Sequence, residues 1–367
     1  MAEAFKETLS LDNVERLANA IHKQDADFHN KVFIEAVQQQ DWAELSLMER
    51  LRAAAGAMVE TLPAESGPDS LIAVLQGNDE LSSWLSLICC EYVVRLESLS
   101  TEQALNYLAQ MTEYFSAEFA IRTLIRKDLE TCLKALRSWL KHENHHVRRL
   151  VSEGSRPRLP WGIRLHEFIE QPELVLPLLE ALRDDEEEYV RRSVANHLND
   201  IAKDHFELVV DISHQWLKNV PAELQKNRLK LIRHACRTLF KQGHPGALEL
   251  FGYGDVTDVD CELNISNSSV AWEDELEFEL QLNKKKNTVN KLMIDYRVYF
   301  QKANGKLAPK VFKWLDREAN ETGVQTFNKK HSFKTVTTRK HYPGKHRLEV
   351  YVNGIKKAQT EFELLAE

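Results

Sequence analysis

Two stretches of this 367-residue chain repeat one pattern, VRRLVSE at residues 147–153 and VRRSVAN at residues 190–196. Their offset is 190 − 147 = 43 residues, the spacing expected of paired-helix repeats of the HEAT type. In each copy the apolar positions can stack one repeat on the next, while adjacent arginines recur at the same place. The pattern therefore predicts an α-solenoid with a cationic track, and a long polyanion, DNA above all, suits such a track.

Helical periodicity extends over residues 1–250, with a third partial copy of the arginine pattern at residues 228–237. Apolar residues at 81, 84, 85 and 88 have helical spacing and predict one buried stripe. Residues 117–140 predict one long helix or two. Clusters of Gly and Pro, such as residues 243–246, stand where repeats should be joined.

Beyond Gly254 the apolar period changes to two, as in Leu276, Phe278, Leu280 and Leu282. Asn-Gly pairs at 304–305 and 353–354 predict tight hairpin turns. Roughly seven short strands fit an antiparallel β-sandwich of immunoglobulin (Ig) type. We therefore predict a multidomain chain, α then β: a HEAT-like α-solenoid in residues 1–252 and an Ig-like β-sandwich in residues 255–367.

Charge is distributed unevenly along a chain whose net charge is −8. Residues 1–139 hold 12 Lys and Arg against 22 Asp and Glu, whereas residues 140–245 hold 17 against 16. The first residues lack the pattern of a signal peptide, and no apolar run is long enough to span a bilayer. Five scattered cysteines predict reduced thiols rather than disulfides. We expect a cytoplasmic monomer, associated with the nucleoid and not with a membrane.

Three tracts resemble a known family: residues 147–161 (VRRLVSEGSRPRLPW), residues 190–205 (VRRSVANHLNDIAKDH), and RHACRTL with GHPGAL in residues 233–248. The chain is similar there to the AlkC branch of the HEAT-repeat (AlkC/AlkD-like) alkylpurine DNA glycosylases, some of which carry an appended Ig-like domain. The resemblance implies excision of alkylated bases from duplex DNA, without the full extrusion of the nucleotide that most glycosylases use.

The same resemblance implies a site made of Glu118, Glu153, Asp200 and Trp161. A base such as N3-methyladenine or N3-methylcytosine is cationic and already a good leaving group, so the protein has mainly to stabilise positive charge on the sugar and to place a water. Carboxylates can do both, and their charge would also attract a cationic base. The indole of Trp161, which follows Pro160 in a loop stiffened by Pro157 and Pro160, can press against the lesion through its π face. Without the resemblance, each acid would be read as a salt-bridged surface residue and Trp161 as a packing anchor.

Basic residues along the repeats and on one turn of the β domain are candidate phosphate contacts, which position a duplex without reading its sequence. Some would instead bridge to the acidic cluster at residues 186–188, and the β-domain lysines could equally form a solubilising hairpin tip. The candidates are Arg148, Arg149, Arg156, Arg158, Arg164, Arg191, Arg192, Lys203, Arg233, Arg237, Lys241, Lys284, Lys285 and Lys286.

The histidines at residues 142–146 do not have zinc-like spacing with other ligands, and no phosphate-binding glycine loop is present, so we expect no metal and no cofactor. No lysine stands out as a Schiff-base nucleophile, which predicts a monofunctional enzyme. The alternative is a non-catalytic HEAT-repeat scaffold that binds a protein partner, and the acidic first third of the chain favours it.

Overall fold

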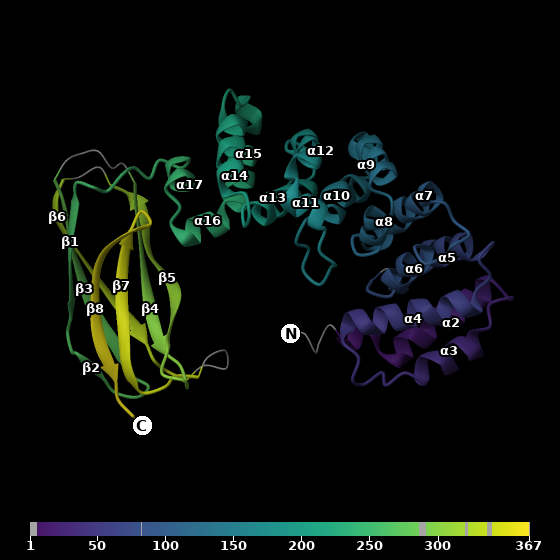
Figure 1. Ribbon diagram of the computed structural model, residues 1–367, viewed down its shortest axis with the longest axis horizontal. Helices are drawn as coiled ribbons and strands as arrows, with labels where there is room; N and C mark the ends of the chain where they lie inside the picture. The colour runs from purple at the N-terminus through teal and green to yellow at the C-terminus, as the bar shows by residue number, and fades with distance from the viewer. Residues whose placement is uncertain (1–5, 82, 286–290, 320–321, 336–339, 367) are drawn as a thin grey trace. The chain divides into compact units, whose positions relative to one another are not determined.

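The computed structural model describes residues 6–81, 83–285, 291–319, 322–335 and 340–366. The chain forms two compact units, Met1–His205 with Asn219–Ala235 (unit 1) and Phe206–Lys218 with Cys236–Glu367 (unit 2). Unit 1 is helical and unit 2 contains all the strands described (Figure 1). The predicted HEAT-like solenoid followed by an Ig-like sandwich is confirmed. The division at residues 252–255 stays a prediction.

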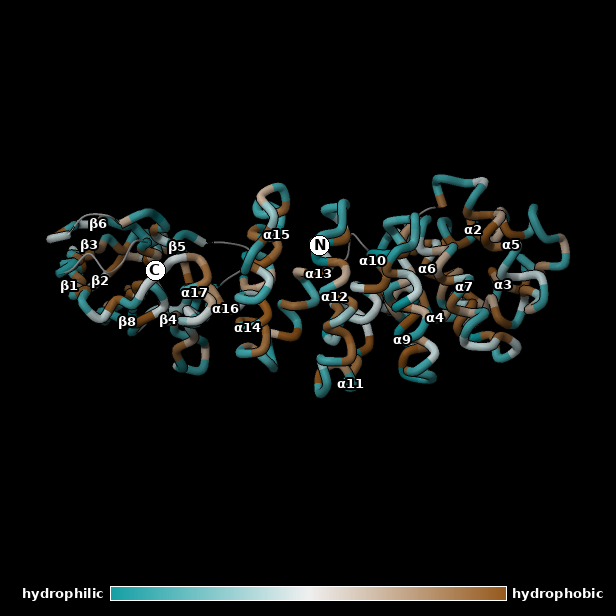
Figure 2. The backbone as a smooth tube through the Cα atoms, turned by 90° about the horizontal axis from the view of Figure 1, so that it is seen from above, coloured by the Kyte–Doolittle hydropathy of each residue, from teal (hydrophilic) through white to brown (hydrophobic). Residues whose placement is uncertain are grey.

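Helices of unit 1 pack side by side in consecutive pairs. In order they are η1 (Glu7–Leu9), α2 (Leu11–Gln24), α3 (Asn30–Gln38), α4 (Leu47–Thr61), α5 (Gly67–Gln76), η2 (Asp79–Leu81), α6 (Ser86–Val93), α7 (Thr101–Met111), η3 (Thr112–Tyr114), α8 (Ile121–Lys127), α9 (Leu129–Ser138), η4 (Trp139–Lys141), α10 (His145–Gly154), α11 (His166–Glu170), η5 (Pro172–Leu174), α12 (Leu176–Leu182), α13 (Glu188–Ile201) and α15 (Ala222–Ala235). Figure 2 shows hydrophobic and hydrophilic segments alternating along them, as amphipathic helices require.

The repeated pattern occupies equivalent helices, α10 and α13, which pack on each other, and α13 packs in turn on α15. Val147, Leu150 and Val151 of α10 are buried, as are Val190 and Val194 of α13. The repeat therefore supplies the apolar stripes that stack the helices, as predicted.

Periodicity predicts one long helix or two in residues 117–140 and one helical stripe around Trp84; the structure has two helices in the first segment and differs in the second. Residues 117–140 form two helices, because Asp128 accepts a hydrogen bond from Thr131 N and starts α9 there. The stripe from Leu81 to Ile88 does not lie on one helix, since η2 ends at Leu81 and α6 begins only at Ser86. Trp84 lies between them, in a turn.

Unit 2 combines α14 (Phe206–Leu217), α16 (Arg237–Gln242) and α17 (Pro245–Glu249) with two sheets. One sheet has the order β1-β3-β6 and the other β2-β8-β7-β4-β5, with all pairs antiparallel except β2 with β8. The strands are β1 (Val259–Ile265), β2 (Ser269–Val270), β3 (Glu275–Lys284), β4 (Lys291–Gln301), β5 (Leu307–Glu318), β6 (Gly323–Ser332), β7 (Gly344–Val352) and β8 (Ile355–Leu364).

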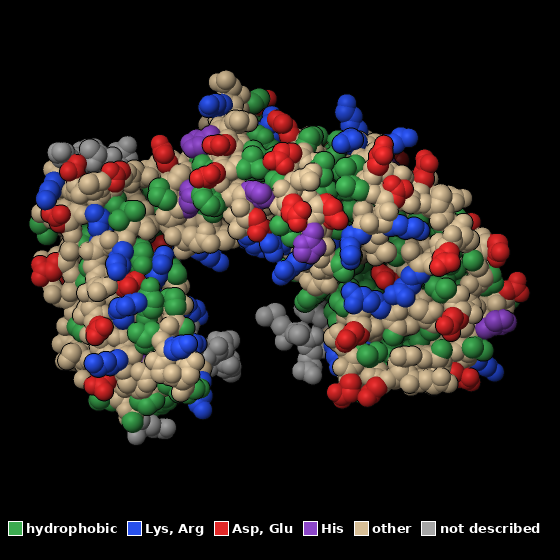
Figure 3. Space-filling view, in the orientation of Figure 1, with side chains coloured by type: hydrophobic (Ala, Val, Ile, Leu, Met, Phe, Trp, Pro, Cys, Tyr) green, Lys and Arg blue, Asp and Glu red, His purple; other side chains and the backbone are tan. Residues whose placement is uncertain are grey.

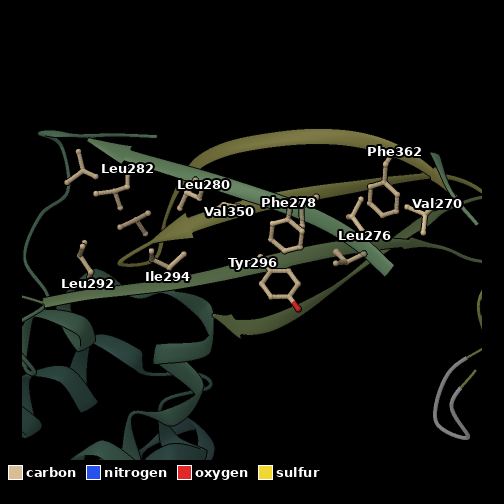
Figure 4. Packing of buried hydrophobic residues seen from close by; sticks show 14 of the residues in the cluster. Val270, Leu276, Phe278, Leu280, Leu282, Leu292, Ile294, Tyr296, Val350 and Phe362 are labelled. Carbon is tan, nitrogen blue, oxygen red and sulfur yellow. The ribbon is translucent and has the colours of Figure 1, made fainter. Parts of the chain in front are cut away.

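The sandwich core consists of the alternating residues predicted from period two. Leu276, Phe278, Leu280 and Leu282 of β3 point toward Ile294 and Tyr296 of β4 and their neighbours (Figure 4). The turn between β7 and β8 is formed by Asn353 and Gly354, both at positive φ (44° and 79°), which confirms that hairpin.

The backbone between helices α16 and α17 lies directly against the backbone of this hairpin. A Cβ added to Gly354 would lie 2.2 Å from the carbonyl oxygen of Gly243, the C-cap of α16. Only glycine permits this approach at positive φ. It helps explain why these helices group with the strands.

Candidate functional site

The predicted carboxylates are brought together in unit 1 by neighbouring elements. Glu153 lies on the last turn of α10, Asp200 lies near the end of α13, and Glu118 lies in the turn before α8. Gly154, the last residue of α10, leaves no room for a side chain, because a Cβ there would lie only 2.7 Å from Ile121 of α8. This close approach positions Glu153 beside the segment that carries Glu118.

Glu153 has both carboxylate oxygens occupied. Its Oε1 accepts a 2.6 Å hydrogen bond from Arg156 Nη1, and its Oε2 accepts one of 2.6 Å from Ser193 Oγ. Arg149 lies 3.6 Å from Oε1. Burial acts to raise the pKa of Glu153, but Arg149, Arg156 and these hydrogen bonds outweigh it, and the pKa falls below its ordinary value. Glu153 is therefore an ionised, immobilised carboxylate.

Asp200 is bound to the same guanidinium. Arg156 donates to Asp200 Oδ2 from Nε at 2.8 Å and approaches it with Nη2 at 2.7 Å, while Lys203 donates to Oδ1 at 2.9 Å. The side chain is almost wholly buried, with 1% exposed. Glu153 and Asp200 thus converge on Arg156 from two successive repeats, rather than facing opposite sides of the solenoid.

Glu118 is held on one side only. Its Oε2 accepts a 2.8 Å hydrogen bond from Ser116 Oγ and is ion-paired with Arg149. Within the described residues no protein donor reaches Oε1. Of the three carboxylates, Glu118 therefore has an oxygen that can still bind a water.

A cavity of about 490 Å³ adjoins this network. It is lined by Trp84, Glu113, Tyr114, Phe115, Ser116, Glu118, Phe119, His146, Arg149, Glu153, Arg156, Leu159, Pro160, Trp161 and Tyr189. Two of the predicted carboxylates thus line the cavity, whereas Asp200 does not and lies behind Arg156. A cavity of this size can hold a nucleobase-sized ligand.

Trp161 stands at this cavity with 53% of its surface exposed. Its backbone has φ of +63°, a left-handed conformation that bulky residues rarely adopt. The indole centroid is 5.7 Å from that of Trp84, which is 5.6 Å from the Phe115 ring. Trp161 is therefore an exposed aromatic side chain that packs on Trp84, which in turn packs on Phe115. It borders the same cavity as the buried Glu153 and Arg156.

The charges of the network balance. Glu118, Glu153 and Asp200 supply three negative charges, and Arg149, Arg156 and Lys203 supply three positive ones. The carboxylates that we expect to attract a cationic base are thus each paired with a protein cation. The network holds its ion pairs and hydrogen-bond dipoles in fixed orientations. Their electrostatic effect on a developing charge is strong where water is excluded.

Several predicted phosphate contacts are engaged inside the protein. Arg148 is 7% exposed and donates to Asp185 from Nε at 2.7 Å and from Nη2 at 3.0 Å, so it joins repeats, which corrects its prediction as a DNA contact. Arg149 and Arg156 hold the carboxylates. Arg158 forms two 2.8 Å bonds with Asp204.

Other predicted basic residues remain at the surface. Arg191 donates to the Glu186 carbonyl at 2.7 Å yet stays partly exposed. The exposed residues are Arg164, Arg192, Lys203 and Arg233 in unit 1 and Lys241 in unit 2, where Arg237 is half-buried. Figure 3 shows Lys and Arg side chains grouped over the part of unit 1 where α8 and α10 lie.

Of the three lysines predicted on a basic turn of the β domain, two lie within the described residues. Lys284 ends β3, is 1% exposed and donates to the Ala319 carbonyl, which corrects its prediction as a DNA contact. Lys285 is exposed but pairs with Asp260 at 2.6 Å. Lys286 lies outside the described residues.

No helix in the described part of the chain is long and apolar enough to cross a membrane. No group of three or more His, Cys, Asp or Glu in that part of the chain has the geometry of a metal site.

Sequence reasoning missed the residues that organise the site. Ser116 and Ser193 orient the carboxylates, Trp84 and Phe115 support Trp161, and Arg122 lies beneath the loop that carries it. Arginines and serines of this kind are frequent in helical proteins, and their role depends on contacts between repeats. Only the position of an arginine next to Ile121, in a segment that also contains Leu124 and Ile125, could have indicated Arg122.

Comparisons with known proteins agree with this architecture. A family model described as the C-terminal Ig-like domain of uncharacterised protein YhaZ matches residues 260–366. The chain is 34% identical over 361 residues to the uncharacterized protein YhaZ of Bacillus subtilis (strain 168), covering 98% of this chain and 99% of that one.

The chain also matches a solved structure, the Pseudomonas fluorescens alkylpurine DNA glycosylase AlkC bound to DNA containing an abasic site analog. Identity is 33%, the TM-score is 0.86, and 99% of each chain is covered. The fold thus places the protein in the class of HEAT-like solenoids with an appended Ig-like domain. The chain belongs to the AlkC family, which confirms the resemblance stated from its sequence tracts.

Proposed function

We propose that this protein is a DNA glycosylase that hydrolyses the N-glycosidic bond of alkylated bases in duplex DNA. Its preferred substrates are cationic bases, N3-methyladenine and N3-methylcytosine, and its product is an abasic site. The observation that carries the proposal is the cavity in which Glu118 and Glu153 meet the exposed indole of Trp161. Membership of the AlkC family supports the same activity.

Each of the three carboxylates has a separate role in the proposed hydrolysis. Glu118, with Oε1 open to the cavity, holds the attacking water and takes up its proton. Glu153, fixed by Arg156 and Ser193, faces the sugar as positive charge develops on it. Asp200 acts through Arg156, whose position it sets.

Trp161 selects the lesion. A cationic base over the indole face gains roughly 0.5–2 kcal/mol. Because the side chain is exposed at the mouth of the cavity, it can press against a nucleotide that stays largely in the helical stack, without full flipping. The residues that line the described cavity include no lysine, which favours hydrolysis without strand cleavage.

Exposed basic residues in unit 1, among them Arg164 and Arg192, would hold the DNA backbone. The enzyme is proposed to act as a monomer in the cytoplasm, at the nucleoid. The non-catalytic scaffold remains the alternative, and salt separates the two, because each phosphate contact contributes a slope of about −0.9 to log K against log salt. A scaffold predicts no appreciable affinity for duplex DNA.

The test is to incubate the protein with methylated duplex DNA and to identify released bases by mass spectrometry. We expect N3-methylated bases from the wild type. Glu153→Gln and Asp200→Asn should lose excision while retaining most DNA affinity. If the wild type binds duplex DNA in a salt-dependent manner but releases no base, the enzymatic proposal is wrong. Should both variants excise normally, the site assignment is wrong.

A further inference from the structure

A fully buried arginine lies beneath the loop that joins α10 to α11. Arg122 of α8 is 0% exposed, and its guanidinium donates to three main-chain carbonyls: Ile163 O at 2.7 Å, Gly154 O at 3.0 Å and Arg156 O at 2.7 Å. Two of these acceptors lie where the loop begins and the third near its end. One side chain of α8 thus ties both ends of the loop to that helix.

The loop is also shaped to fit Arg122. A Cβ on Gly162 would lie 3.2 Å from Arg122 Nε and 3.1 Å from a Leu159 methyl, so this position has little room for a side chain. Burial, followed by the nearby Arg156, lowers the pKa of Arg122 to about 10. At neutral pH the guanidinium is therefore still protonated and able to donate.

This loop carries two groups that the cavity needs. Arg156 holds Glu153 and Asp200, and Trp161 stands at the cavity in a left-handed conformation with φ of +63°. A conformation of that kind persists only where the surroundings over-determine it. The residues flanking Trp161 are Pro160, which stiffens the chain, and Gly162, which lies on Arg122.

We propose that Arg122 is a positioning residue for base excision, which fixes the 155–165 loop so that Trp161 and Arg156 keep the placement that the reaction requires. The inference rests on the proposed function for its catalytic consequence. Its structural content, that one guanidinium holds this loop, stands separately. Arg122 does not line the cavity and acts only through the loop.

The chain offers a matched control in the same unit. Arg50 of α4 is likewise buried, 5% exposed, and its guanidinium donates to three main-chain carbonyls, those of Trp42, Lys6 and Leu9. The residues bound by Arg50 lie among the first elements of the chain, before α4, and are not among those lining the cavity. A loss of general stability should follow from changing either arginine, whereas loss of loop placement should follow only from changing Arg122.

The experiment compares full-length Arg122→Lys, Arg122→Met and Arg50→Lys with the wild type. Hydrogen exchange is measured for the amides of residues 155–165, including Gly162 N and Leu165 N, which are bonded to Leu159 O and Pro157 O. In parallel, the single-turnover excision rate and the affinity for methylated duplex are measured. Lysine retains a charge and part of the hydrogen bonding, so it serves as a partial rescue should the methionine variant fold poorly.

We expect exchange in residues 155–165 to accelerate in the order wild type, Lys, Met, with α13 unchanged in the Lys variant. The excision rate should fall in the same order, for the Met variant by about 100-fold, the scale of a displacement near 1 Å at a reacting centre. Duplex affinity should change little. Arg50→Lys should leave both the loop exchange and the excision rate at wild-type levels.

Wild-type exchange in this loop for both Arg122 variants would overturn the inference. So would an equal loss of excision in Arg50→Lys, since that would show a general effect of stability. If the wild type itself releases no base, the proposed function fails, while the exchange data still decide whether Arg122 holds the loop.

Discussion

Replacing Asp200 with asparagine tests the buried ion pairs most sharply. Asp200 is 1% exposed and accepts two contacts from Arg156, at 2.8 and 2.7 Å, and one from Lys203, at 2.9 Å. Asparagine keeps one acceptor oxygen but presents an NH₂ group to at least one of these cations. Arg156 then stays buried with Glu153 as its remaining carboxylate.

The magnitude follows from this geometry. Removing one partner of a buried ion pair costs about 3–5 kcal/mol. Because asparagine retains an acceptor and Lys203 is partly solvated, we expect a loss below that range, roughly 2–3 kcal/mol from the free energy of unfolding. For a unit of this size, that loss lowers the unfolding temperature by roughly 5–10 °C.

Asp204→Asn is the matched control. Asp204 accepts two 2.8 Å bonds from Arg158, but the two side chains are 31% and 24% exposed, so the expected loss is below about 1 kcal/mol. Thermal unfolding and single-turnover excision are measured on both variants. Excision should fall by about 100-fold or more in Asp200→Asn, the scale of losing one preorganised electrostatic group, and little in Asp204→Asn. Equal unfolding temperatures and equal rates for the two variants would refute this reasoning.

Three further predictions address pH, lesion contact and backbone. Burial, followed by Arg156, lowers the pKa of His197 to about 3. The contribution of the neutral imidazole to the free energy of unfolding is therefore fully present above pH 6.5. It should fall as the pH drops toward 3, by up to about 1.4 kcal/mol per pH unit. His197→Gln should flatten this dependence in denaturant titrations. Trp161→Ala should weaken excision of cationic bases more than affinity for undamaged duplex, measured by competition. Gly354→Ala should strongly destabilise unit 2, because its Cβ would collide with Gly243 O, and an unaltered melting profile would disprove that.

The fold could be predicted largely from local periodicity. The repeat at residues 147 and 190 specifies equivalent helices, and period two with Asn353-Gly354 specifies the β7–β8 hairpin. Boundaries were less accessible, because η2 and the start of α6 depend on how turns pack. The stripe predicted around Trp84 failed for that reason.

Within the site, the residue types and their convergence could be predicted, but their partners could not. Glu153 and Asp200 do meet, yet they meet on Arg156, which sequence reasoning had assigned to phosphate. The sequence alone does not distinguish an arginine that binds DNA from one that binds a carboxylate 44 residues away. Which of these occurs is decided by burial, and burial is a property of the packed repeats. The same holds for Lys284, which packs beneath the β domain's surface.

The most direct measurement of the central claim is the single-turnover excision rate of Glu118→Gln on a duplex with one N3-methylated base. Glu118 lines the cavity, and glutamine keeps its size and one acceptor oxygen while removing the charge. We predict a fall of at least about 100-fold at nearly unchanged duplex affinity. A rate within a few fold of the wild type would contradict it.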